Sequence, residues 1–183
     1  MVETLRPRPT TDAAGFLPGP LGLRLDEEFL PLASLSAAPK TLDEILLFGQ
    51  VRTDADTLML RLWPSTLWAS GPSPNDDIRS TDISHGMTHL RLRGVEALHF
   101  IAHYTRADLH ETEIRRSRAV RTRLNHYDCA LWWTNTRDIH IVTDRSMAQS
   151  LVEHLRALSL RHSAADPSKT PRPVAPGAPD RRG

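Results

Sequence analysis

Alternating apolar positions predict short strands near the middle of the chain. Leu58, Leu60 and Leu62 alternate with other residues within 56–63, which is the spacing of a strand with one buried face. Residues 65–70 have the composition of a further short strand, and the proline- and glycine-containing stretch after them is typical of a loop.

A third strand is predicted to run directly into a helix. Residues 88–93 alternate apolar and polar side chains until Gly94 breaks the pattern. Val95, Leu98 and Ala102 then follow one another at i, i+3 and i+7, which places them on one face of a helix.

Alternation returns in the second half of the chain and predicts three more strands. Residues 120–124 form the first of them, with arginines on the solvent-facing side. Residues 127–133 and 138–144 are expected to pair as an antiparallel hairpin whose loop is the four residues 134–137.

The last predicted element is a helix of roughly fifteen residues. Its start is capped either by Ser146, which has capping-box spacing to Gln149, or by Asp144. Its apolar positions are spaced at i, i+4, i+8 and i+11: Met147, Leu151, Leu155 and Leu158.

The order of strands, helix, strands and helix predicts an α+β fold, in which helices pack on one face of a mainly antiparallel sheet. Prolines without periodicity indicate that residues 1–20 are a flexible N-terminal segment. Residues 21–162 form the predicted domain, and the proline-rich residues 163–183 are expected to be a disordered tail.

The composition is that of an ordinary folded protein. Apolar residues make up 39% of the 183 residues and the net charge is +1, so no overall field attracts nucleic acid or an anionic membrane. Cys129 is the only cysteine, which excludes an intrachain disulfide and fits a reducing compartment. The sequence has no continuous apolar stretch of signal-peptide or membrane-spanning length, and we therefore expect a cytoplasmic protein.

Histidine spacing raises the question of a metal site. His85 with His89, and His99 with His103, are both separated by four residues, but the first pair spans a glycine and a strand start. The second pair shares a helical face, yet the neighbouring sequence supplies no third ligand. We therefore predict no metal site and expect surface or partly buried histidines.

Candidate catalytic groups have equally plain interpretations. Asp108, His110 and Glu111 have the types needed for acid–base chemistry, but a solvated loop of charges explains them better. Cys129 lies within an alternating apolar strand, where a thiol behaves as a small buried side chain. The sequence contains neither a phosphate-binding loop nor a dinucleotide motif, so we predict no catalytic or cofactor-binding residue in this chain.

A contact with another protein is the more specific prediction. Trp132 and Trp133 are neighbours on a predicted strand and point to opposite faces, so both are buried only if a helix or another chain covers the second face. Tryptophan and arginine are enriched at protein interfaces. The candidate subunit interface therefore consists of Arg121, Arg123, Trp132 and Trp133.

Ordered pieces of the sequence resemble a known family. They are LMLRLWPSTLWASGP, DISHGMTHLRLRGVEALHFIAHYTRADLHE, RAVRTRLNHYDCALWW and DIHIVTDRSMAQSLVEHLRAL, which together cover roughly residues 56–160. In order and spacing they look like the gamma subunit of heterotetrameric sarcosine oxidase and related N-methyl amino acid oxidases or dehydrogenases. The connection over residues 74–81 is shorter than the family's, and residues 1–50 match loosely.

The resemblance implies a fold similar to the N-terminal part of glycine cleavage T-proteins. It implies a complex that demethylates a secondary N-methyl amine oxidatively and passes the one-carbon unit to tetrahydrofolate. FAD, FMN, NAD and tetrahydrofolate are then expected in the large (alpha), beta and small (delta) partner subunits, while this chain is non-catalytic. The matched motif positions carry no assigned chemical role: Asp82, Arg91, Gly94, Asp108, His110, Arg123 and Arg145.

Two other functions stay open at this point. A free-standing folate-binding or one-carbon transfer protein of the T-protein kind would bind tetrahydrofolate by itself. A nucleic-acid-binding module would use the arginines of residues 115–123, although acidic residues stand just upstream of them.

Overall fold

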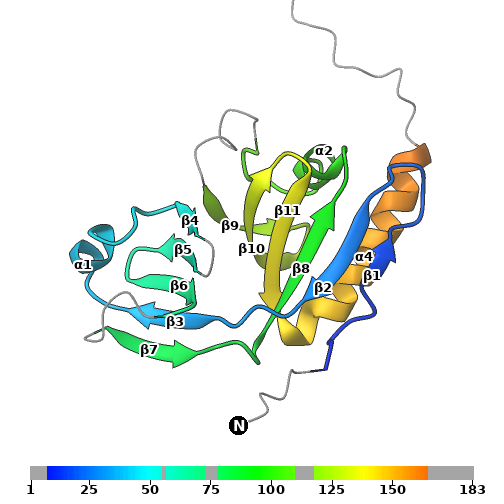
Figure 1. Cartoon of the computed structure of the whole chain (residues 1–183). Coiled ribbons are helices and arrows are strands. Elements are labelled where there is room, and N and C mark those ends of the chain that lie inside the picture. Colours follow the sequence, from blue (N-terminus) through cyan, green and yellow to red (C-terminus); the bar gives the residue numbers. More distant parts are fainter. Residues whose placement is uncertain (1–7, 55–56, 73–77, 110–117, 165–183) are drawn as a thin grey trace, which may run out of the picture.

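The computed structural model describes residues 8–54, 57–72, 78–109 and 118–164. Two antiparallel sheets and a few helices make up this part of the chain, which confirms the α+β class (Figure 1). The sequence analysis expected one sheet. The strands divide between two sheets because alternation identifies a strand but not its neighbours.

The larger sheet has six strands in the order β1-β2-β8-β11-β10-β9, and every neighbouring pair is antiparallel. Long strands with apolar side chains on one face form its centre, where Ile141 of β11 pairs with Leu90 of β8. The strands are β1 (Ala14–Phe16), β2 (Arg24–Glu28), β8 (Met87–Arg93), β9 (Ala119–Leu124), β10 (Tyr127–Asn135) and β11 (Asp138–Asp144).

The smaller sheet has five strands in the order β4-β5-β6-β3-β7. All of them lie between β2 and β8 along the chain, so this sheet is an insertion between two neighbouring strands of the larger sheet (Figure 1). The strands are β3 (Ala33–Ser36), β4 (Val51–Thr53), β5 (Leu58–Trp63), β6 (Thr66–Ser70) and β7 (Arg79–Asp82).

Helices α2 (Ala97–Ala102) and α4 (Arg145–Ala164) pack on one face of the larger sheet, as expected, whereas α1 (Pro39–Asp43) belongs to the smaller sheet. Helix α4 has 20 residues rather than about fifteen. Met147 is largely exposed, and the buried stripe of α4 consists of Ala148, Leu151, Val152, Leu155 and Leu158.

Three apolar clusters fill the spaces between these layers. The largest lies between α2, α4 and the larger sheet and contains Phe100, Leu131 and Trp133. The second lies between the two sheets and contains Trp68 and Trp132, and the third lies where α1 covers the smaller sheet. One face of the larger sheet therefore meets helices, and part of the other face meets the second sheet.

The N-terminal segment differs from the prediction that residues 1–20 are flexible. Residues 1–7 lie outside the described residues, but β1 pairs with β2, and Ala13 and Leu17 on either side of it are buried. The side chain of Glu27 accepts hydrogen bonds from the backbone amides of Thr10 and Thr11 at 2.8 and 2.7 Å. Anchors that are distant in sequence hold this segment, and a local pattern cannot reveal them.

The β10–β11 connection is also tighter than expected. Asn135 pairs with Asp138, which leaves two residues in the turn instead of the predicted four. The side-chain Oδ1 of Asn135 accepts a hydrogen bond from the backbone amide of Arg137 at 2.8 Å. An asparagine side chain that bonds the backbone two residues on favours such a short turn.

The two sheets are joined by two chain crossings that hydrogen bonds hold together. The backbone amide of Leu32 donates to Ser84 Oγ at 2.8 Å, and Ser84 Oγ lies 2.6 Å from Asp82 Oδ1. The hydroxyl and backbone amide of Ser84 both bond the Asp82 carboxylate, and they lower its pKa. The matched position Asp82 therefore has a structural role, which is to fix the crossing between the sheets.

Arg61 of β5 is a buried cation, although the alternation places it on a solvent-facing side. Its side chain is 1% exposed and donates hydrogen bonds to Asp43 Oδ1 and to backbone carbonyls, among them those of Trp63 and Leu46. A guanidinium has five donors and suits several carbonyls at once. Arg61 thereby connects β5 to the segment that includes α1.

Within the described residues, none of the helices combines the length and the apolar character needed to cross a bilayer.

Candidate functional site

The two tryptophans of the predicted subunit interface are not on the surface. Trp132 is 3% exposed and Trp133 is 4% exposed. The helix layer covers Trp133, and the inserted second sheet covers Trp132. Other parts of this chain therefore cover both faces of β10, where we had expected a helix or another chain. We remove Trp132 and Trp133 from the candidate interface because they are buried.

The two arginines of the predicted interface do lie at the surface. Arg121 and Arg123 are exposed on β9, which is an edge strand of the larger sheet. The guanidinium of Arg121 lies 5.3 Å from the centre of the Trp63 ring, and Arg123 Nε donates to Asp128 Oδ1 at 2.8 Å. Both side chains are therefore held in place while their outer surfaces face solvent.

A cleft of about 250 Å³ opens between the two sheets beside Arg121. Trp63 and Trp68 form part of its wall, with ring centres 5.1 Å apart, and Val142 contributes from the larger sheet. Asp128 adds a carboxylate. A second carboxylate, Asp144, also lines it, so the cleft combines aromatic walls with one arginine and two carboxylates, which suits contact with a partly apolar side chain or small molecule.

A buried histidine pair lies on the same face of the larger sheet. His89 Nε2 and His140 Nδ1 are 3.0 Å apart, and the two rings stack with the ring of Trp132. Burial lowers the pKa of His89 to about 3, with the neighbouring His140 adding to the shift, and burial lowers the pKa of His140 to about 4. Both rings are therefore neutral near pH 7, and one of them donates to the other.

Ion pairs on the same face of the larger sheet connect β8 and β11 to β2. Arg91 donates to both oxygens of Asp138, at 2.8 and 2.7 Å, and lies 3.4 Å from Glu28. Burial opposes ionisation of Asp138, but hydrogen bonds from Arg91 and Thr134 outweigh it and lower the pKa of Asp138. The matched position Arg91 thus links three strands of the sheet.

The remaining matched positions are scattered. Gly94 has a φ of +147°, and a Cβ there would lie 2.9 Å from the Leu23 side chain, which explains the glycine. Arg145 donates to the carbonyl of Arg8 at 3.1 Å. Asp108 is described and exposed, whereas His110 and Glu111 lie outside the described residues.

Cys129 is buried, as the strand pattern predicted. Burial raises the pKa of its thiol to about 12. Because the thiolate is the reactive form, this cysteine is a weak nucleophile at neutral pH.

The two histidine pairs of the sequence have different outcomes. His85 is exposed and His89 is buried, so they do not form a common site. His99 and His103 do come together at α2, and His162 of α4 joins them. The sequence analysis missed His162, although it lies four residues after Leu158 and so continues the buried stripe of α4.

Comparison with solved structures shows a likeness in fold. The chain is similar to a chain of the heterotetrameric sarcosine oxidase from Corynebacterium sp. U-96, solved in complex with pyrrole 2-carboxylate, with a TM-score of 0.67 and 23% sequence identity. The match covers 82% of this chain and 90% of that chain. No protein-family model and no curated protein sequence matches this chain. At this identity, the likeness shows a shared fold.

Proposed function

We propose that this chain is a non-catalytic, gamma-type subunit of a sarcosine-oxidase-like heterotetramer. The observation that carries the proposal is the structural match, which covers most of both chains. Since so much of the neighbour is matched, that neighbour is itself a small chain without a large additional domain. A small subunit of an oxidoreductase complex is the role that this similarity favours.

The state of the reactive side chains supports a structural role. The Cys129 thiol is buried, and the histidine pair is neutral and packed against Trp132. In the proposed complex, the alpha, beta and delta partner subunits hold FAD, FMN, NAD and tetrahydrofolate. The complex demethylates a secondary N-methyl amine in the cytoplasm and passes the one-carbon unit to tetrahydrofolate.

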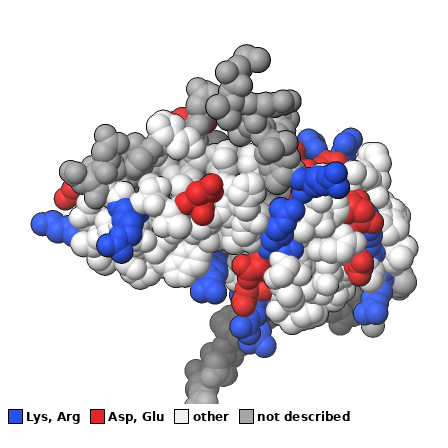
Figure 2. Space-filling view, turned by 90° about the horizontal axis from the view of Figure 1, so that it is seen from below, with Lys and Arg blue, Asp and Glu red and all other residues white. Residues whose placement is uncertain are grey.

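The proposed partner contact is centred on Arg121, which lines the cleft, and it includes the exposed Arg123 two residues further along β9. The ring of Trp63 lies under Arg121, so a partner side chain that enters the cleft meets aromatic carbon and a cation together. Elsewhere the surface is mixed, and Figure 2 shows acidic and basic side chains next to one another at one end of the molecule. Mixed charge favours a specific protein contact over nucleic acid.

Co-expression tests this proposal. The chain is co-expressed with candidate flavoprotein subunits, one flavoprotein carries the affinity tag, and the ratio of this chain to bound flavin is measured after purification. We expect a constant ratio and a complex that survives gel filtration. The double variant Arg121→Glu/Arg123→Glu should reduce the co-purified amount at least ~10-fold, because charge reversal against a complementary surface costs more than 1.4 kcal/mol.

The matched control is Arg52→Glu/Arg137→Glu, which makes the same charge change at exposed positions on β4 and in the β10–β11 turn. This control should co-purify like the unchanged chain. A chain that never co-purifies with a flavoprotein would contradict the proposal. Calorimetry with tetrahydrofolate on the isolated chain then decides whether it is a free-standing folate-binding protein.

A further inference from the structure

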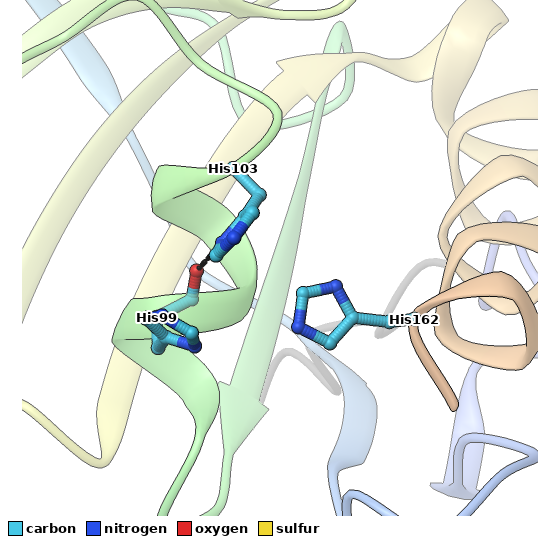
Figure 3. Close-up of side chains that lie close together, drawn as sticks. All are labelled: His99, His103 and His162. Atoms are coloured by element: carbon cyan, nitrogen blue, oxygen red, sulfur yellow. Dashed lines mark hydrogen bonds between the residues drawn. The ribbon is translucent and has the colours of Figure 1, made fainter. Parts of the chain in front are cut away.

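Three histidines that are far apart in sequence meet at the surface between α2 and α4. His99 lies in α2, His103 follows its last residue, and His162 comes from the last turns of α4. Figure 3 shows the imidazole of His162 pointing from α4 toward the other two. Each histidine offers one ring nitrogen, and the three nitrogens lie within 4.8 Å of one another.

The Nδ1 atom of each ring already has an oxygen neighbour. His103 Nδ1 lies 2.8 Å from the backbone carbonyl oxygen of His99, as the dashed line in Figure 3 marks. His99 Nδ1 lies 3.6 Å from a carboxylate oxygen of Glu96, and His162 Nδ1 lies 3.4 Å from the hydroxyl of Tyr104. Metal-binding histidines usually have such a partner on one nitrogen, which orients the ring and leaves the other nitrogen, here Nε2, to bind the ion.

The spacing is close to that of a bound ion. Zinc–nitrogen bonds of about 2.1 Å in a tetrahedron place the ligand nitrogens about 3.4 Å apart. The rings need to approach by little more than an ångström, and the His99 side chain, 65% exposed, has room to rotate. The neighbouring rings of the cluster are nearly perpendicular, at 81–86°, so they converge edge to face and do not stack into a packed layer.

We propose that His99, His103 and His162 form a binding site for a divalent transition-metal ion, with zinc as the best match. Three neutral imidazoles suit zinc, nickel, copper or cobalt, whereas magnesium and calcium prefer oxygen ligands. The three histidines occupy three corners of a tetrahedron, and water takes the fourth. The ion would tie the end of α2 to the end of α4.

Charged residues near this site have opposite effects on the binding of a cation. Glu96 adds a negative charge beside His99, which favours a cation, and Arg161 is an exposed positive neighbour next to His162 in the chain.

Metal titration of the full chain, prepared without a polyhistidine tag, tests the site. Calorimetry with zinc chloride should show one ion bound per chain, and cobalt should give the visible spectrum of a tetrahedral site. Loss of an orienting partner commonly reduces metal affinity 10–100-fold, so Glu96→Gln should weaken binding about 10-fold. Loss of a ligand, as in His162→Ala or His99→Ala, should weaken binding at least ~100-fold.

The control variant is His154→Ala, which removes a histidine from the same helix but outside the cluster. It should bind zinc like the unchanged chain. Circular dichroism in metal-free buffer checks the folding of each variant, and the exposed His99 gives the deciding variant if His162→Ala unfolds. The proposal is overturned if the unchanged chain binds no zinc, or if the folded His99→Ala chain binds zinc as tightly as the His154→Ala chain.

Discussion

The chain contains two histidine clusters in opposite surroundings. His89 and His140 are buried on the larger sheet, where they stack with Trp132 and hydrogen-bond each other at 3.0 Å. His99 and His103 are exposed and meet His162 at the surface, where one ring nitrogen of each lies within 4.8 Å of the others. Both clusters consist of histidines. They differ in how many ring nitrogens solvent or an ion can reach.

Burial separates the two kinds of role. In the buried pair, stacking with an aromatic ring and a mutual hydrogen bond use the imidazole as a polar packing unit, and a positive charge there is costly. In the surface cluster, the backbone and neighbouring oxygens orient the rings, and burial of His162 is only partial. The first cluster is therefore expected to control stability, and the second is expected to control ligand binding.

The largest effect is expected from removing one member of the buried pair. His140→Ala leaves His89 without its partner and opens a cavity next to Trp132, which should lower the free energy of unfolding by roughly 3–4 kcal/mol. Chemical denaturation followed by tryptophan fluorescence measures it. His85→Ala at an exposed position is the control, and an equal small loss in both variants would contradict the assigned role of the pair.

The contribution of the same histidine pair to the free energy of unfolding should depend on pH. The pKa values of His89 and His140 in the folded chain, about 3 and about 4, lie below the ordinary histidine value of 6.5, so the unfolded chain binds more protons between pH 4 and 6.5. The stabilisation by the neutral pair is complete above pH 6.5 and falls as the pH drops toward 4. The loss between pH 7 and pH 5 should be about 3–4 kcal/mol.

The double variant His89→Phe/His140→Phe separates this effect from that of the carboxylates. It replaces both polar rings by apolar rings of similar size, and its stability should change less between pH 7 and pH 5 than that of the unchanged chain. Denaturant titrations at each pH measure the difference. If the two chains lose stability in parallel, the pair is not the origin of the acid sensitivity.

Zinc should stabilise the chain through the surface cluster. At a free zinc concentration 100 times the dissociation constant, binding to the folded state adds about 2.7 kcal/mol. Thermal unfolding with and without zinc measures this, and a chelator should reverse it. His99→Ala should show no such gain, and a gain of the same size in that variant would place the zinc elsewhere.

The smallest effect is expected from the surface cluster without metal. His99→Ala and His103→Ala replace exposed side chains, so the free energy of unfolding in metal-free buffer should change by less than about 0.5 kcal/mol. Denaturation curves in a chelating buffer measure it. A loss comparable to that of His140→Ala would mean that these rings pack as structural elements, and it would remove the contrast between the two clusters.

Local patterns predicted most of the strands but not their grouping. Alternation located β5, β8, β9 and the β10–β11 hairpin, and composition located β6, whereas the short strands β1, β2, β3, β4 and β7 were not predicted. It did not reveal that β5 and β6 belong to an inserted second sheet. Strand partners are set by long-range pairing, which a window of a few residues does not contain.

The same limit applies to the sites. The i, i+4 spacing correctly placed His99 and His103 on one helical face. His162 joins them through the packing of α4 on the sheet, which only the folded chain defines. Arg61 had the appearance of a solvent-facing residue, because several of its partners, among them the carbonyls of Pro39 and Leu46, lie 15 to 22 residues away in the sequence. Trp132 and Trp133 were correctly recognised as a pair that needs cover on both sides. The helix layer covers Trp133, and an inserted sheet that the sequence analysis did not expect covers Trp132.

The insertion of the smaller sheet between β2 and β8 has a consequence for how quickly the chain reaches its native state. Leu25 pairs with Leu92, and the whole five-stranded sheet lies in the chain between them. Closing a loop of this length costs conformational entropy before the β2–β8 contact stabilises the chain, and folding slows as contacts become more distant in sequence. The edge of β2 that pairs with β8 therefore has no partner on the newly synthesised chain until β8 has been made, and it is open to other molecules in that interval.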